Sequence, residues 1–225
     1  MKAKLENFWY HYKIPTIIIA AAVVFLTVVG IQIATKQSYD LYVLYAGPVN
    51  INDNLSSTAT VQKMERGFAA LAGDDDLKTT VQSFVWVNDT LAAEYKKNDV
   101  YVNATQNRKM LQTVLDAVAS GKTPIMLFDP EIYEQVKDLG ALEKLSDVMG
   151  YQVDASPDGY GVRLGDTALW RGVSGFGDLP ADTVLCVRNL QNGFSLVGKT
   201  TENEKWSRQL DIFRAMIEYG RDGIE

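Results

Sequence analysis

The chain has 225 residues, with 22 lysines and arginines against 28 aspartates and glutamates, and a formal net charge of −6 at pH 7. This acidic balance argues against a nucleic-acid-binding protein, because a phosphate backbone attracts basic surfaces. The chain has a single cysteine, Cys186, so an internal disulfide is excluded. Its single histidine, His11, lies near the N-terminus, so residues 12–225 cannot form a catalytic or zinc site that needs a histidine.

Residues 14–33 form an apolar run without a charged residue, which predicts a membrane-spanning helix. At ~1.5 Å per residue, a helix of this length covers the ~30 Å hydrocarbon core of a bilayer. Three lysines precede the run and a single lysine follows it before Asp40, so the N-terminus is expected in the cytoplasm. The alternative is a cleaved signal peptide, but the run is long for one and no good small-residue cleavage site follows it.

The span divides the chain into five expected parts. These are a cytoplasmic flank (1–13), a transmembrane helix (14–34), a short stalk (35–38), an extracytoplasmic α/β domain (39–220) and a tail (221–225). Three lysines and one glutamate precede the span, so the exported part has 19 basic and 27 acidic residues and a net charge near −8. The expected localisation is the cell membrane, with the bulk of the chain outside the cytoplasm.

The first half of the domain alternates between strand-like and helical segments. Strands are expected at 39–45, 79–87 and 124–128, and helices at 58–72, at 105–120 and after Asp129-Pro130, which has the N-cap and first-turn residues of a helix. A polar hinge follows residue 87, with a short strand or turn at 100–103. This alternation predicts a mainly parallel sheet flanked by helices.

The second half has a different texture. Residues 151–181 are rich in glycine, with short strands expected at 160–164 and 167–171. An apolar strand is expected at 183–188, and a helix with one apolar face closes the domain before Gly220.

Ligands of open α/β sheets bind beyond the carboxyl ends of the strands. That rule selects the turn Ala46-Gly47-Pro48, then Asn88, and then Asp129 with Tyr133 nearby. A loop whose backbone N–H groups lie at a helix start can hold an anion. The alternative interpretation is that Gly47-Pro48 is only a turn and Asp129 only a helix cap.

Three arginines of the second half, Arg163, Arg171 and Arg188, lie on or beside expected strands. Converging arginines can bind a carboxylate or phosphate through paired hydrogen bonds. The commoner explanation is solvation of edge strands.

Other chemistry has little support in the sequence. Asp74-Asp75-Asp76 lacks the ligand spacing of a calcium loop, and Asp129 with Glu131 is better explained by the helix dipole than as a glycosidase pair. We therefore expect no catalytic residues, no metal and no cofactor.

Four segments together resemble the type 2 periplasmic, or extracellular, solute-binding protein family: YDLYVLYAGP, PIMLFDPEIYEQVKDLGALEKLSDVMG, DTVLCVR and WSRQLDIFRAMIEY. The aromatic flank ENFWYHYK is similar to that of anchored proteins of Gram-positive, Clostridia-type bacteria. The resemblance covers about residues 39–220 and implies a solute-binding α/β domain. Only about fifty residues separate the third strand from the return strand, so the second lobe is expected to be reduced or missing.

The resulting expectation is a non-catalytic, membrane-anchored binding module that captures a small ligand or a transporter or envelope protein, without nucleic acid. The alternative is an envelope scaffold that has lost solute binding, and a carboxylate-only hydrolase is a distant third. An open pocket where the loops after residues 45, 87 and 128 meet favours solute binding. A pocket plugged by residues 151–181 favours the scaffold.

Overall fold

The computed structural model describes residues 14, 17–30, 39–52, 59–189 and 199–221, with the side chains of 199–205 left out. The expected flank 1–13, the stalk, residues 15–16 and 31–34 of the span and most of the tail lie outside the described residues. The chain divides into two compact units, residues 1–38 and 39–225. Each is described by itself below.

The described part of the first unit is a helix over residues 17–30. Its side chains are almost all exposed, and the Thr27 hydroxyl donates to the Val23 carbonyl at 2.8 Å within the helix. Within the described ranges, no helix combines the length and the apolar character needed to cross a bilayer. The membrane span therefore remains a prediction.

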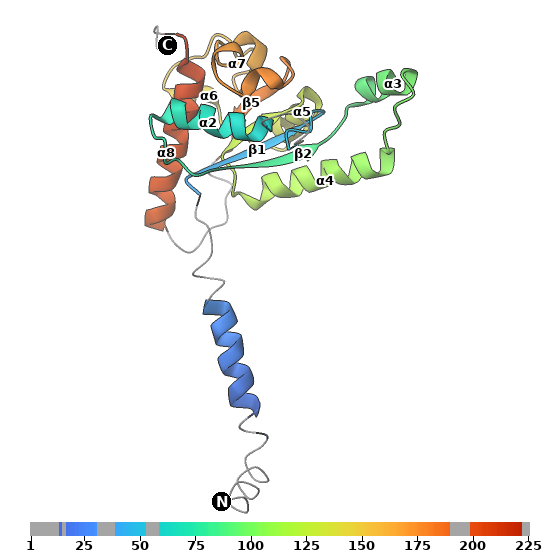
Figure 1. The fold of residues 1–225 in the computed structure, drawn as a ribbon. Helices are drawn as coiled ribbons and strands as arrows, with labels where there is room; N and C mark the ends of the chain where they lie inside the picture. Colours follow the sequence, from blue (N-terminus) through green and yellow to red (C-terminus); the bar gives the residue numbers. More distant parts are fainter. Residues whose placement is uncertain (1–13, 15–16, 31–38, 53–58, 190–198, 222–225) are drawn as a thin grey trace, which may run out of the picture. The chain divides into compact units, whose positions relative to one another are not determined.

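The second unit is an α/β domain built on one five-stranded sheet (Figure 1), so the expected fold class is confirmed at this level. The strands are β1 (Leu41–Gly47), β2 (Thr79–Val85), β3 (Ile125–Phe128), β4 (Gly161–Arg163) and β5 (Val184–Val187), in the order β2-β1-β3-β5-β4. β1 pairs in parallel with both β2 and β3, as predicted. β5 runs antiparallel to both its neighbours, β3 and β4, so the sheet is mixed rather than mainly parallel.

Helices cover both faces of the sheet. The helices are α2 (Thr60–Ala72), α3 (Asp89–Lys97), α4 (Ala104–Ser120), α5 (Pro130–Asp138), α6 (Leu145–Met149), α7 (Leu169–Gly172) and α8 (Lys199–Glu218). Alternate strand residues such as Val43 and Tyr45 pack with Met64 and Phe68 of α2 and with Phe213 of α8. The strand residues between them pack against α4 and α5. The central strands β1, β3 and β5 are thus almost wholly buried on both faces, as their apolar sequences indicate, whereas the edge strand β2 is only partly covered.

Residues 151–181 pack onto the same core as α2. Phe176 meets Phe68 edge to face at 5.3 Å between ring centroids, and Lys63 of α2 pairs with Asp178 at 2.7 Å. Gly175, at φ +88°, comes so close to the backbone of α2 that an added Cβ would lie 2.5 Å from the Met64 nitrogen. A glycine is required there for both conformation and space. Contacts do not divide residues 39–225 into two lobes.

Two local predictions in this region and before it are wrong. The strand expected at 167–171 is instead the short helix α7, because the Gly172 and Val173 N–H groups donate to carbonyls four residues earlier and not to a neighbouring strand. The hinge expected after residue 87 contains the helix α3, and no strand forms at 100–103, where Asn103 caps α4.

Candidate functional site

The carboxyl ends of β1, β2 and β3 meet through backbone hydrogen bonds. The Trp86 N–H donates to the Gly47 carbonyl at 2.9 Å, and the Asp129 N–H donates to the Ala46 carbonyl at 2.8 Å. The turn at Gly47-Pro48 folds over Tyr45, whose hydroxyl accepts from the Val49 N–H at 3.2 Å. The predicted loops therefore do lie together at one edge of the sheet.

Gly47 makes this close turn possible. An added Cβ would lie 2.7 Å from the Tyr45 hydroxyl oxygen, nearer than real Cβ atoms approach. Burial is the main cause that raises the pKa of Tyr45, to about 12. The space under the turn is thus filled by a neutral tyrosine of the core and is closed to a ligand.

Asn88 and Asp129 join the second and third of these loops. The Asn88 Nδ2 donates to the Asp129 Oδ2 at 3.0 Å, while its Oδ1 accepts from the Leu91 N–H at 2.8 Å and caps α3. The second carboxylate oxygen of Asp129 accepts from the Glu131 N–H at 2.9 Å and caps α5. Asn88 thus caps α3, Asp129 caps α5, and the bond between the two side chains joins the two helix starts.

Asp129 is a buried carboxyl group, only 5% exposed. Burial raises its pKa, hydrogen bonds from the Glu131 N–H and Asn88 oppose that rise, and the nearby charge of Asp182 adds to it. Burial also raises the pKa of Glu131, and the charges of Asp129 and Asp89 act in the same direction. The start of α5 therefore already holds a carboxylate of this chain, where an anionic ligand was predicted.

Tyr133 belongs to a separate surface cluster. Its hydroxyl lies 2.7 and 2.9 Å from the two carboxylate oxygens of Asp158, and Lys137 is 2.9 Å from the same carboxylate. Burial, followed by the Asp158 hydrogen bond, raises the pKa of Tyr133. Although burial opposes it, the hydrogen bonds from Lys137, Tyr133 and the Tyr160 N–H lower the pKa of Asp158. This cluster ties α5 to the loop before β4.

The three arginines do not gather at one point. Arg163 is exposed and pairs in register with Val184 at the start of β5, whereas Arg188 follows the other end of β5. Arg171 is exposed, with its guanidinium carbon 5.7 Å from the ring centroid of Trp170.

Arg188 is only 6% exposed and has a structural partner. Its Nη1 donates to the Val118 carbonyl in the last turn of α4, and its guanidinium lies against Gly121, which ends α4 at φ +77°. Burial lowers the pKa of this guanidinium. A cation at a helix C-terminus is favoured by the helix dipole, so Arg188 acts as a cap of α4.

Sequence reasoning missed an excursion of the chain between Val87 and Asn107. In it, α3 has no buried residue, and the following loop exposes Val100 (51%) and Tyr101 (87%). Figure 1 shows α3 standing apart from the sheet. We call residues 88–106 the arm. The helix in the arm has sequence signals that could have revealed it: the N-cap Asn88, an acid in the first turn (Asp89) and two bases in the last turn (Lys96 and Lys97).

The described residues outside these clusters carry little further chemistry. They contain no group of three or more histidine, cysteine, aspartate or glutamate side chains placed to hold a metal ion. Cys186 is fully buried in the sheet, and that burial raises the pKa of its thiol. It behaves as a small apolar side chain of the core.

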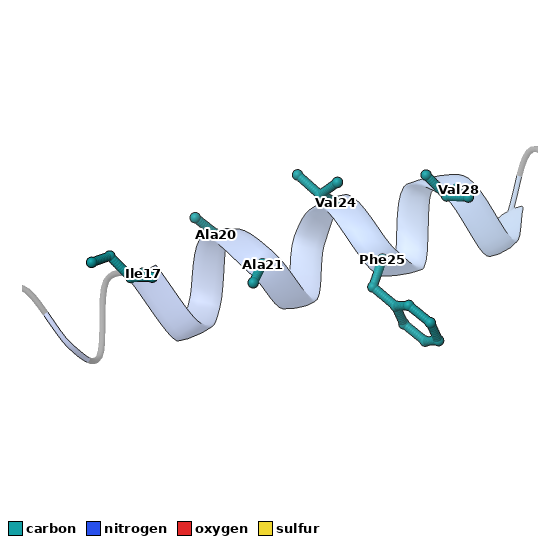
Figure 2. A pocket seen from close by; sticks show the side chains of 6 residues that line it. All are labelled: Ile17, Ala20, Ala21, Val24, Phe25 and Val28. Atoms are coloured by element: carbon teal, nitrogen blue, oxygen red, sulfur yellow. The ribbon is translucent and has the colours of Figure 1, made fainter.

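The helix over residues 17–30 presents one further surface. Figure 2 shows six side chains along it that recur at the three- and four-residue intervals of one helix face: Ile17, Ala20, Ala21, Val24, Phe25 and Val28. All six are apolar, so this face suits lipid or an apolar helix rather than a polar solute.

Comparison of the chain with protein-family models, with curated proteins and with solved structures found no match.

Proposed function

We propose that this protein is a single-pass membrane protein whose extracytoplasmic α/β domain docks another component of the cell envelope, without catalysis. The domain works as an interaction module and does not close over a small solute. The observation that carries this proposal is the pairing of Asn88 with Asp129, which uses the polar groups of the predicted ligand edge for internal structure.

The segment 173–183 supports the same choice. Gly175 packs against the start of α2, and Asp182 lies near enough to Asp129 and Tyr45 to raise the pKa of both, after burial as the larger cause. Both Asp129 and Tyr45 are at most 5% exposed. A covered and internally satisfied strand edge favours a scaffold over a solute receptor.

The arm is the element that best fits a docking role. A helix without a buried residue contributes little to the core, yet Asn88 and Asn107 hold the base of the arm through three hydrogen bonds, one to Asp129 and two to Val87. The exposed Val100 and Tyr101 lie at its turn. Exposed tyrosines anchored on a rigid base are frequent centres of protein interfaces.

The membrane anchor rests on the apolar run 14–33 and on the lysines before it. The resemblance of four segments to solute-binding proteins supports binding rather than catalysis. Small-solute capture is the second candidate, and the resemblance is what favours it.

A thermal-unfolding screen of the full chain in detergent micelles separates the two candidates. Amino acids, short peptides, sugars and divalent metals are added at concentrations up to the millimolar range. We expect no stabilisation, because Asn88 and Asp129, described polar side chains of the predicted ligand edge, are already bonded to each other and to the starts of α3 and α5. A reproducible rise in the unfolding temperature with one solute, lost in Asn88→Ala, would establish solute binding instead.

A further inference from the structure

A groove lies at the opposite, amino-terminal edge of the sheet, on the face covered by α4. It encloses about 340 Å³ and is lined mainly by Tyr39, Tyr42, Thr80, Gln82, Lys122 and Thr123. The rings of Tyr39 and Tyr42 meet edge to face with centroids 6.0 Å apart, and Tyr42 lies opposite Thr80 in the β1–β2 register.

The groove exists because α4 covers only part of this face. Leu44, Ala46 and Phe84 pack with Val114 and Val118 of α4, whereas Gln82 is exposed and Tyr42 and Thr80 are half-buried. Lys122 follows directly on Gly121, which ends α4, and is exposed beside this uncovered stretch. The lining therefore offers an ammonium group, hydroxyl groups and an amide next to two aromatic rings.

We propose that this groove binds the phosphate-bearing headgroup of a membrane phospholipid, so that the domain rests on the bilayer by its amino-terminal edge. The inference depends on the membrane anchor of the proposed function. Tyr39 is six residues beyond Ile33, so chain length keeps it within ~20 Å of the end of the predicted span. The headgroup layer itself occupies the first ~5–8 Å of that distance.

The chemistry of the lining fits this occupant. Tyrosines favour the membrane–water interface, because their rings are apolar and their hydroxyl groups are hydrated. A lysine near a surface of anionic phospholipids gains electrostatic energy from their net negative charge. The exported part has a net charge near −8, and the exposed ammonium group of Lys122 supplies a positive charge at the groove.

The test uses the full chain reconstituted in phospholipid vesicles. A fluorophore is attached to Gln82→Cys at the groove or to Thr90→Cys on α3, which follows the other end of β2. The native Cys186 is 0% exposed and is not expected to react. Lipids with a spin-labelled headgroup quench a fluorophore only at short range, so we expect quenching at position 82 and little at position 90.

The phosphate contact is tested with Lys122→Glu, with Lys97→Glu on the arm as the matched charge control. Lys122→Glu is expected to lower the ratio of quenched to unquenched fluorophore at position 82 about fivefold or more. The reason is that one lysine near a surface of anionic phospholipids contributes ~1 kcal/mol. Lys97→Glu is expected to leave it unchanged. Equal quenching at positions 82 and 90, or no effect of Lys122→Glu, would overturn the proposal.

Two controls separate this inference from the proposed function. Alkaline extraction is done first, and a chain that leaves the vesicles contradicts the anchor itself. A chain that stays but shows no preferential quenching contradicts only the groove. The full chain in phospholipid-free detergent micelles is then titrated with glycerol phosphate, and a rise in unfolding temperature at millimolar concentration that Lys122→Glu abolishes would show a soluble phosphate ligand in place of a lipid.

Discussion

The side-chain amide of Asn107 holds both backbone polar groups of Val87. Its Oδ1 accepts from the Val87 N–H at 3.0 Å, and its Nδ2 donates to the Val87 carbonyl oxygen at 2.6 Å. The chain leaves the sheet at Val87 and returns at Asn107, so one side chain closes the base of the whole arm. A buried backbone N–H or carbonyl group that loses its hydrogen-bond partner costs more free energy than the hydrogen bond contributes to stability when it is formed.

Replacing Asn107 by alanine is expected to lower the free energy of unfolding by ~1–3 kcal/mol, because it leaves the Val87 N–H and carbonyl unsatisfied. Hydrogen exchange should also become faster across the arm than in the sheet. The control is Asn98→Ala, which removes an exposed bond to the Glu94 carbonyl and should cost a few tenths of a kcal/mol. Similar losses in the two variants would show that Asn107 does not hold the arm.

Two substitutions at Asp129 separate a structural role from a ligand role. Asp129→Ala removes the cap of α5 and the bond from Asn88, and is expected to cost ~1–2 kcal/mol of stability. Asp129→Asn keeps an N-cap oxygen for α5 but turns an amide nitrogen toward the Asn88 Nδ2 donor, so it is expected to lose the bond from Asn88 and to cost less stability than Asp129→Ala.

The pH dependence of stability reports the protonation of Asp129. Burial raises its pKa, so its folded form binds a proton more tightly than the unfolded chain does. The stability of the native protein relative to Asp129→Asn should therefore fall as pH rises through the carboxyl range. Urea unfolding of both proteins between pH 3 and 8 measures it, and a relative stability that increases with pH contradicts a desolvated Asp129.

Asp158 should behave in the opposite way. Its hydrogen bonds from Lys137, Tyr133 and the Tyr160 N–H outweigh burial and lower its pKa. The stability that ionised Asp158 contributes is fully present above the usual pKa of a carboxyl group. It is lost as the pH falls through the lowered pKa of Asp158 in the folded protein. Relative to Asp158→Asn, the native protein should thus become more stable as pH rises from acid, and a flat difference would show that the cluster is not formed in solution.

Arg188 tests whether the second-half arginines serve a ligand or the fold. Arg188→Ala removes a charged donor to the Val118 carbonyl from a buried position and should cost ~2–3 kcal/mol. The matched control is Arg163→Ala on the exposed edge strand, expected within about 0.5 kcal/mol. Coinciding unfolding curves for the two variants would show that Arg188 does not cap α4.

The elements that local chemistry specifies were predictable from the sequence. Asp129 and Pro130 do begin α5, and Gly73, Gly121 and Gly150 do end helices with positive φ. The apolar runs that contain β1, β3 and β5 are strands, because a run buried on both faces can hardly fold otherwise in a chain of this size.

What the sequence could not reveal depends on partners distant in the chain. The insertion of β5 between β3 and β4 is decided by pairings such as Met126 with Cys186, which no local signal indicates. The burial of Arg188 depends on the end of α4, seventy residues earlier. The groove was missed because no local signal shows that Tyr39 and Tyr42 of the first strand lie beside Lys122 and Thr123, some eighty residues later.

The most direct test of docking through the arm is site-specific photocrosslinking in intact cells. A photoreactive residue is placed at Tyr101 on the arm or at Leu139, which is 66% exposed at the end of α5, in the full chain. The docking account predicts one discrete adduct of higher mass from position 101, lost when Asn107→Ala releases the arm, and none from position 139. The absence of an adduct at 101, or equal adducts at both positions, would contradict it.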